Sequence, residues 1–112
     1  MAYGQVIEAL ADPTRRALFE RLRTRERSVG DLADFAGIRQ PTVSQHLAVL
    51  RGARLVSDRR DGTRRYYRAS REGLDELRRY VASFWDDVLA AFAAEDANPP
   101  ASRRRTRGKG AR

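Results

Sequence analysis

Cysteine is missing from the sequence, and histidine occurs once, at His46, among the 112 residues. Without thiols the chain cannot form disulfides, thiolate zinc sites, iron–sulfur clusters or a cysteine nucleophile. A single imidazole also excludes any metal or catalytic site that needs two histidines. The sequence therefore predicts that the protein is not an enzyme and binds no metal or other cofactor.

Long apolar runs are absent as well. The longest run, from Val88 to Ala94, has seven residues, whereas a membrane-spanning helix needs about 20. The first residues show no basic segment followed by a long apolar stretch, which is the pattern of a secretory signal. We therefore expect a cytoplasmic protein that does not enter a membrane.

Lysine is scarce too, since Lys109 is the one lysine among 23 basic residues, and the net charge is +8. This charge is unevenly placed along the chain. Residues 1–38 are neutral, residues 39–71 carry nine arginines against two acids, residues 72–100 carry two arginines against seven acids, and residues 101–112 carry six basic residues and no acid. The two positive blocks predict a polyanionic partner, either nucleic acid or an anionic membrane.

Hydrophobic periodicity and capping residues predict four helices in the first half of the chain, at about residues 3–10, 13–25, 29–36 and 40–52. Asp12 and Ser28 are typical of a helix N-terminus, whereas Gly37 and Gly52 are typical of a helix end. In the fourth helix, apolar residues at i, i+4 and i+7 predict the buried side: Val43, Leu47 and Leu50.

The periodicity then becomes that of strands. Residues 55–60 and 63–69 favour β-strands, and Asp61-Gly62 between them indicates a two-residue hairpin turn, because both residues tolerate positive φ. This turn predicts that Asp58 lies opposite Arg65 across the strands.

A long helix follows, capped by Ser70, with apolar residues at intervals of three and four up to Phe92. Residues 98–112 begin with Asn-Pro-Pro and are expected to be a disordered, Arg-rich tail, which either adds phosphate contacts or is a solvated extension. Residues 1–97 are predicted to form one mainly α domain with a small β-hairpin, a winged helix-turn-helix.

The exposed side of the helix at 40–52 carries side chains that form hydrogen bonds with base edges. No acid occurs between Asp34 and Asp58, a stretch that would approach phosphates. We therefore predict that this helix binds in the DNA major groove, with a contact set of Arg39, Gln40, Thr42, Ser44, Gln45 and His46. The alternatives are a solvated helix face and, for His46, a half-buried imidazole bonded to the backbone.

Four arginines surround the predicted turn and complete the DNA-contact set: Arg59, Arg60, Arg64 and Arg65. A narrow hairpin with arginines at its tip suits a minor groove or its phosphate edges. Arg65 is expected to pair with Asp58, which leaves the other three as the better DNA ligands. The alternative is that these charges keep an exposed strand edge from pairing with another chain.

The segments ALADPTRRALFERL, SVGDLADFAGIRQPTVSQHLAVLRGARLV and DRRDGTRRYYRAS together resemble the ArsR/SmtB family of bacterial winged-helix repressors, over about residues 5–95. The resemblance implies a homodimeric repressor that binds an inverted repeat in double-stranded DNA. When bound to DNA, such a repressor is expected to be associated with the nucleoid. The resemblance also implies a dimer interface between the first and last helices, formed here by Val6, Ile7, Leu10, Val81, Phe84, Trp85, Val88 and Phe92.

The chain departs from many members of that family at the positions where they sense metals. Residues 28–34 lack the cysteine-rich motif, and the last helix offers Asp86, Asp87 and Glu95 but no histidine. Carboxylates alone, without a recognisable loop, are weak ligands for Mg²⁺ or Ca²⁺. The chain therefore resembles the metal-independent members of the family. No feature of the sequence indicates a small-molecule effector. Two other functions stay open, a winged-helix scaffold for protein interactions and an RNA-binding module.

Overall fold

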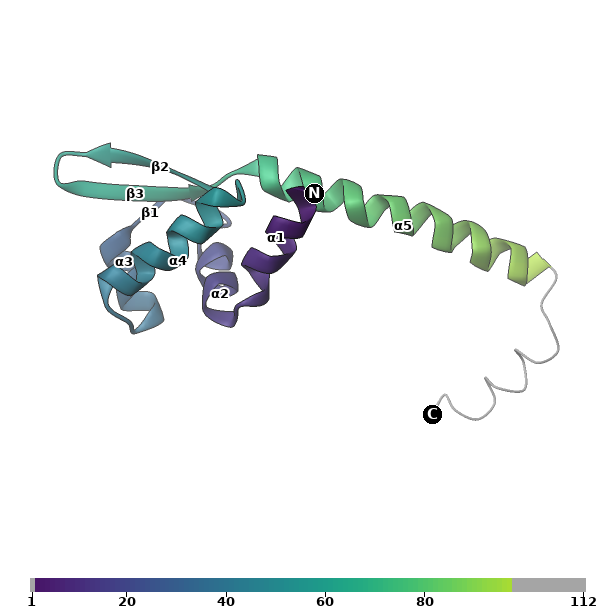
Figure 1. The fold of residues 1–112 in the computed structure, drawn as a ribbon, viewed down its shortest axis with the longest axis horizontal. Coiled ribbons are helices and arrows are strands. Elements are labelled where there is room, and N and C mark those ends of the chain that lie inside the picture. Colours follow the sequence, from purple (N-terminus) through teal and green to yellow (C-terminus); the bar gives the residue numbers. More distant parts are fainter. Residues whose placement is uncertain (1, 98–112) are drawn as a thin grey trace. The chain divides into compact units, whose positions relative to one another are not determined.

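The computed structural model describes residues 2–97, and the predicted tail at residues 98–112 lies outside them. The described residues form five helices and three strands (Figure 1). In chain order these are α1 (Ala2–Ala11), α2 (Pro13–Arg21), β1 (Arg27–Ser28), α3 (Val29–Ala36), α4 (Gln40–Gly52), β2 (Val56–Asp61), β3 (Arg64–Ala69) and α5 (Arg71–Ala97). The mainly α fold with a small β-sheet confirms the predicted fold class.

The chain divides into two compact units, one up to Arg79 and the other from Tyr80, so that α5 contributes to both. Of the second unit, Tyr80–Ala97 belong to the described residues. The single domain over residues 1–97 stays a prediction.

Local hydrogen bonds explain where the first helices begin. The Asp12 carboxylate accepts a hydrogen bond from the Arg15 N–H (2.9 Å), and the Ser28 hydroxyl accepts one from the Asp31 N–H (3.1 Å). Each satisfies an N–H group that the start of a helix leaves without an intrahelical partner. Gly37 ends α3 with a φ of 70°, which glycine adopts without steric cost.

The second helix is shorter than predicted, because α2 ends at Arg21 rather than at residue 25. Leu22 leaves the helical conformation and is buried in the core. The chain turns here because Arg27 and Ser28 form β1, which pairs with β3. Residues 22–26 contain no glycine or proline to signal this end, so tertiary pairing overrides a segment that is compatible with a helix.

The sheet is antiparallel with the strand order β1-β3-β2, and the sequence analysis did not predict β1. The predicted turn is also wrong by one residue. Asp61 pairs with Arg64, so the turn residues are Gly62 and Thr63. Gly62 has a φ of 64°, whereas Thr63 is not among the described residues with positive φ. A turn with glycine in the first position and a negative φ in the second fits type II′. In this register Asp61 belongs to the strand, so it does not adopt the positive φ that the predicted Asp61-Gly62 turn would require.

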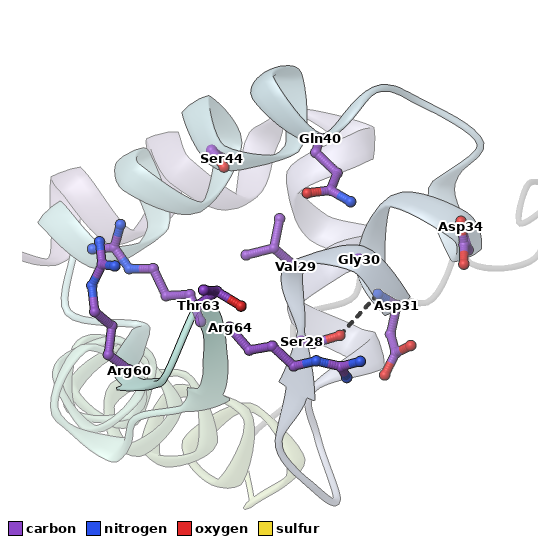
Figure 2. Close-up of a pocket in the computed structure, with 11 residues that line it drawn as sticks. Ser28, Val29, Gly30, Asp31, Asp34, Gln40, Ser44, Arg60, Thr63 and Arg64 are labelled. Carbon is purple, nitrogen blue, oxygen red and sulfur yellow. Dashed lines mark hydrogen bonds between the residues drawn. The ribbon is translucent and has the colours of Figure 1, made fainter.

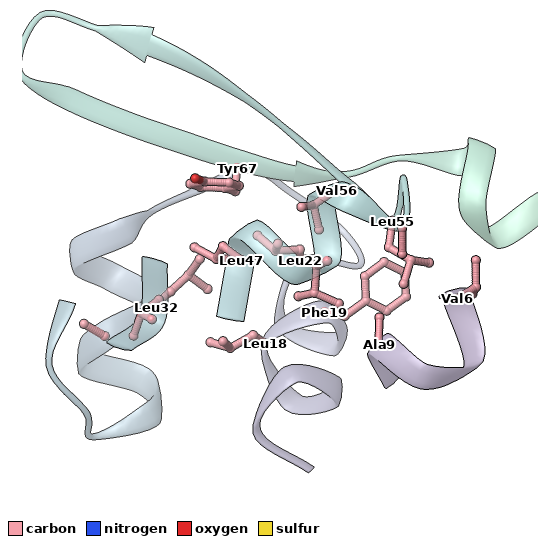
Figure 3. Packing of buried hydrophobic residues seen from close by; sticks show 14 residues of the cluster. Val6, Ala9, Leu18, Phe19, Leu22, Leu32, Leu47, Leu55, Val56 and Tyr67 are labelled. Atoms are coloured by element: carbon pink, nitrogen blue, oxygen red, sulfur yellow. The ribbon is translucent and has the colours of Figure 1, made fainter. Parts of the chain in front are cut away.

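The core of the first unit lies between α1–α4 and one face of the sheet (Figures 1 and 3). Val43, Leu47 and Leu50 are fully buried, as the spacing in α4 predicts. In Figure 3, Val56 and Tyr67 cover the helices from the sheet side. The side of α4 that faces away from this core is therefore free to form a surface.

α5 begins against the turn that follows α4. The Gly73 N–H donates to the Arg54 carbonyl (2.7 Å), and a Cβ at this position would collide with the carbonyl oxygens of Ala53 and Arg54. Glycine is therefore required by close approach rather than by its φ. Arg54 itself has a φ of 61° and also forms an ion pair with Glu76 (2.5 Å).

Candidate nucleic-acid interface

The exposed surface of α4 carries four of the ten residues predicted to contact DNA. With Val43, Leu47 and Leu50 buried, the exposed polar side chains of the helix are Gln40, Thr42, Ser44 and Gln45, preceded by exposed Arg39. Thr42 and Gln45 lie on the part of this surface that the sequence predicted. Gln40 and Ser44, one turn apart, lie on the flank beside it, which borders the β2–β3 hairpin, called the wing from here on.

A hollow of about 500 Å³ separates this flank of α4 from the wing (Figure 2). Gln40 and Ser44 line it from α4, and Arg60, Thr63, Arg64 and Arg65 line it from the wing. α3 forms the remaining wall and contributes two carboxylates, Asp31 and Asp34, with Asp31 near Ser28 in Figure 2. The hollow therefore has neutral polar side chains on α4, arginines on the wing and carboxylates on α3.

His46 differs from the other predicted contact residues of α4 because it is half-buried. Asp12, the N-cap of α2, has a pKa below its usual value, mainly because of the hydrogen bond from the Arg15 N–H and to a smaller degree because of the His46 charge. His46 therefore lies within electrostatic range of the start of α2. The structure does not bring it into the hollow between α4 and the wing, and its contact with DNA stays a prediction.

Arg59, on the β2 strand of the wing, is held by a carboxylate from outside the wing. Both nitrogens on one edge of the Arg59 guanidinium donate to Glu26, each at 2.8 Å. The same guanidinium lies 4.7 Å from the ring centre of Tyr66, its partner residue on β3. The hydrogen bond from Arg59 lowers the pKa of Glu26. Arg59 is thus engaged in the free protein, although the sequence placed it among the better DNA ligands.

A second carboxylate, Asp58, holds one arginine from the wing and one from α4. Its Oδ2 accepts a hydrogen bond from Arg65 (2.7 Å), and its Oδ1 accepts one from Arg51 (3.2 Å). These bonds, that from Arg65 foremost, lower the pKa of Asp58 against the opposing effect of burial. The predicted pair of Asp58 with Arg65 is confirmed, but it runs diagonally, because Tyr67 is the residue opposite Asp58.

Arg60 and Arg64 are the two arginines beside the turn of the wing that stay open, whereas Arg68, farther along β3, contacts Ser57. Both Arg60 and Arg64 are exposed, and within residues 2–97 neither forms an ion pair with a carboxylate. They lie on either side of the turn and line the hollow together with Gln40 and Ser44. The surface therefore combines neutral donors and acceptors on a helix with two unpaired cations on a hairpin.

Sequence reasoning missed the role of Arg51 and Glu26 at this surface. Glu26 is 33 residues away from Arg59, and no local pattern connects the two. Arg51 follows directly from the helical repeat, because it lies seven residues after Ser44 on the flank that faces the wing. A helical projection that included the charged residues would have found it.

Metal and membrane sites receive no support from the described part of the chain. Residues 2–97 contain no group of three histidine, cysteine or acidic side chains that is able to hold a metal ion. None of the helices in this range is both long enough and apolar enough to span a bilayer.

The predicted dimer surface divides into buried and exposed residues. Val6 is fully buried, Leu10 is partly buried against the core, and Ile7 is 44% exposed. In the second unit every large apolar side chain of the predicted set is about half exposed: Val81, Phe84, Trp85, Val88 and Phe92. The same side of the helix also carries Leu89. This apolar stripe exceeds the scattered apolar residues of an ordinary surface.

Comparison with known proteins gives a consistent result. The family described as a helix-turn-helix domain matches residues 10–59, which include α2, β1, α3 and α4. The HTH-type transcriptional regulator Rv2034 of Mycobacterium tuberculosis is 49% identical over 86 residues, which is 77% of this chain and 80% of the relative. The transcriptional repressor SdpR of Bacillus subtilis is 33% identical over 81 residues, which is 72% of this chain and 90% of the relative.

Solved structures show the same likeness. The crystal structure of a possible transcriptional regulator for arsenical resistance superposes with a TM-score of 0.66 and 43% identity, over 80% of this chain and 93% of the other. A second crystal structure, of NolR from Sinorhizobium fredii, superposes with a TM-score of 0.61 and 32% identity, over 75% and 84%. The two curated relatives are named as a transcriptional regulator and a transcriptional repressor, and neither is named as an enzyme.

Proposed function

Because the chain belongs to the ArsR/SmtB family of helix-turn-helix transcriptional regulators, we propose that it is a homodimeric repressor that binds an inverted repeat in double-stranded DNA. One observation carries the proposal most directly. The exposed polar flank of α4 borders a wing on which Arg60 and Arg64 have no carboxylate partner within the described residues. Such a surface joins base-edge recognition to phosphate contact.

In this proposal α4 is the recognition helix. Thr42, Ser44 and Gln45 extend from its first two turns, the part of a recognition helix that reaches base edges in the major groove. Gln is suited to adenine, and Ser and Thr bond either to bases or to phosphates. Arg60 and Arg64 contact the neighbouring phosphates or the minor groove, and the contact of Arg39 is with the phosphates before α4.

The apolar stripe of α5 supports the proposed dimer. Phe84 and Trp85 are 52% and 61% exposed, and removing such rings from water is favourable by about 25 cal/mol per Å² of apolar area. A second copy of the same helix offers a surface of the same chemistry, as a two-fold interface requires. Two recognition helices related by this symmetry bind two half-sites, whose centres are one or two helical turns apart, roughly 34 Å per turn.

Repression in this scheme results from occlusion of the DNA and requires no metal. The chain has no cysteine, and its one histidine lies on α4, so the cysteine-rich motif and the last-helix histidine of metal-sensing family members are both lacking. The proposal places the protein in the cytoplasm and on the nucleoid when DNA is bound. It assigns no small-molecule effector.

Charge reversal on the wing tests the proposal. The double variant Arg60→Glu/Arg64→Glu is expected to lose affinity for duplex DNA in fluorescence anisotropy while sedimentation still shows the dimer. Arg78→Glu/Arg79→Glu is the matched control, because it makes the same charge change on α5, outside the hollow. Equal DNA affinity of the wing variant and the wild type would support a protein-interaction scaffold instead. Stronger competition by double-stranded RNA than by duplex DNA would support an RNA-binding module.

A further inference from the structure

Three arginines beside the proposed DNA surface are already bound to carboxylates. Asp58 holds Arg51 and Arg65, and Glu26 holds Arg59 through two hydrogen bonds. In the same region Arg60 and Arg64 have no such partner within residues 2–97. Asp58 and Glu26 therefore hold the three arginines at hydrogen-bond distance, and Asp61 adds a longer contact to Arg59 (3.9 Å).

The two carboxylates differ in what they connect. Asp58 joins β2 to α4 through Arg51 and to β3 through Arg65, so it bridges the two sides of the hollow. Glu26 precedes β1 and holds Arg59, whose guanidinium also lies against Tyr66. Asp58 therefore links the wing to α4, and Glu26 holds one arginine on the wing itself.

We propose that Asp58 and Glu26 are specificity-determining residues, which withdraw Arg51, Arg59 and Arg65 from the phosphate backbone and so restrain binding to DNA of unrelated sequence. The inference rests on the proposed function. Non-specific affinity is almost wholly electrostatic and rises with the number of phosphates that basic residues neutralise. Specificity depends on the ratio of operator affinity to non-specific affinity. If all the arginines of the wing were unpaired, non-specific affinity would rise more than operator affinity.

A purely stabilising role for these ion pairs is the competing explanation. Ion pairs at the protein surface contribute little to folding stability, because solvent screens them and the long side chains lose entropy. If stability were their role, neutralising the carboxylates would shift the unfolding transition and leave the affinity for mixed-sequence DNA unchanged. The two explanations therefore differ in DNA binding, not only in stability.

Neutral variants provide the test. Asp58→Asn and Glu26→Gln in the full chain are titrated by fluorescence anisotropy with two duplexes, the sequence that the wild type enriches from a random pool and a mixed-sequence duplex. Each variant is expected to bind the mixed-sequence duplex roughly threefold to tenfold more tightly, with a log–log salt slope steeper by about 0.9 for each phosphate newly neutralised. The ratio of the two affinities is expected to fall.

Asp75→Asn is the matched control. Asp75 also holds two arginines, Arg78 and Arg79, and its neutralisation makes the same change in net charge. Because these residues lie on α5 and do not line the hollow, the control is expected to leave the salt slope and the affinity ratio at their wild-type values. An equal effect of Asp75→Asn would show that net charge alone is responsible and would overturn the inference.

Two other results would overturn it. The first is that both variants bind mixed-sequence DNA with the wild-type affinity and slope. The second is that both lose affinity for the two duplexes alike, which would mean that the carboxylates only maintain the wing. If Asp58→Asn unfolds, Glu26→Gln still gives the answer, since its side chain is 33% exposed. A wild type without preference for any duplex would refute the proposed function itself, whereas unchanged variants of a selective wild type refute this inference alone.

Discussion

The Oδ1 atom of Asp58 on β2 lies 3.2 Å from a terminal nitrogen of Arg51 on α4, so an ion pair ties the wing to the proposed recognition helix. In the proposed function the two elements make different contacts with DNA, and their relative position decides whether both contacts form at once. An exposed side chain such as Arg51 contributes little stability by itself. The ion pair between Arg51 and Asp58 matters because it connects the wing to α4.

Gln45→Ala is expected to weaken binding to the operator by about 1–3 kcal/mol. The loss is expected to come from the one or two base pairs that Gln45 contacts, so the variant no longer discriminates among bases there. The reason is that an exposed amide in the first two turns of α4 is placed to pair with a base edge. Binding to a panel of operators with single base changes measures the effect. Gln5→Ala removes a similar exposed amide from α1 and serves as the control. A uniform loss over all sequences in the Gln45 variant would contradict base recognition by α4.

Trp85→Glu is expected to convert the dimer into a monomer. The variant places a charge within the apolar stripe, at a side chain that is 61% exposed in the single chain. Sedimentation velocity measures the change. Ala90→Glu is the control, because Ala90 follows Asp86 by one turn on the charged side of the same helix. A Trp85→Glu protein that sediments as a dimer would rule out this face of α5 as the interface.

Acid is expected to weaken the wing through Asp58. The folded-state pKa of Asp58 is lowered by Arg65 and Arg51, so its ion pairs contribute stability above the unfolded pKa of about 3.9, and this contribution is lost as the pH falls through the lower folded pKa. Asp58→Asn is therefore expected to be less stable than the wild type at neutral pH, by about 1 kcal/mol or less for each pair. Chemical denaturation between neutral pH and about pH 2 measures both proteins. A stability difference that persists at the lowest pH would contradict this origin.

Gly73→Ala is expected to destabilise the first unit by about 1–3 kcal/mol, because the added methyl group collides with the carbonyl oxygens of Ala53 and Arg54. Urea denaturation measures the change. Gly52→Ala is the control, since a Cβ there meets no atom within 4 Å. If the Gly73 variant and the wild type had the same free energy of unfolding, α5 would be able to shift away from the turn without loss of stability, and the predicted steric clash would be refuted.

Most of the fold could be predicted because its elements have local signals. Val43, Leu47 and Leu50 define a helical repeat, and Ser28 and Gly37 mark the two ends of α3. β1 has no such signal, because a two-residue strand exists only through its pairing with Tyr66 and Tyr67. The turn was misplaced by one residue because Asp-Gly suits a hairpin in two registers, and strand pairing selects the one with Gly62 first.

The candidate site follows the same division. Gln40, Thr42, Ser44 and Gln45 were predicted from the helical repeat, and all of them are exposed on α4. The division of the wing arginines into bound and unbound was predictable only for Arg65, whose carboxylate partner is nearby in the sequence. Glu26 reaches Arg59 only after β1 has joined the sheet, so that pair required the three-dimensional structure.

Selection of bound duplexes from a random DNA pool by the wild-type chain is the decisive test of operator recognition by a two-fold symmetric repressor. The account predicts enrichment of an inverted repeat whose half-site centres are one or two helical turns apart, roughly 34 Å per turn. Enrichment of such a repeat would show DNA recognition and two-fold symmetry in one measurement. A pool that stays random after repeated selection, or that yields a single site without symmetry, would contradict the account.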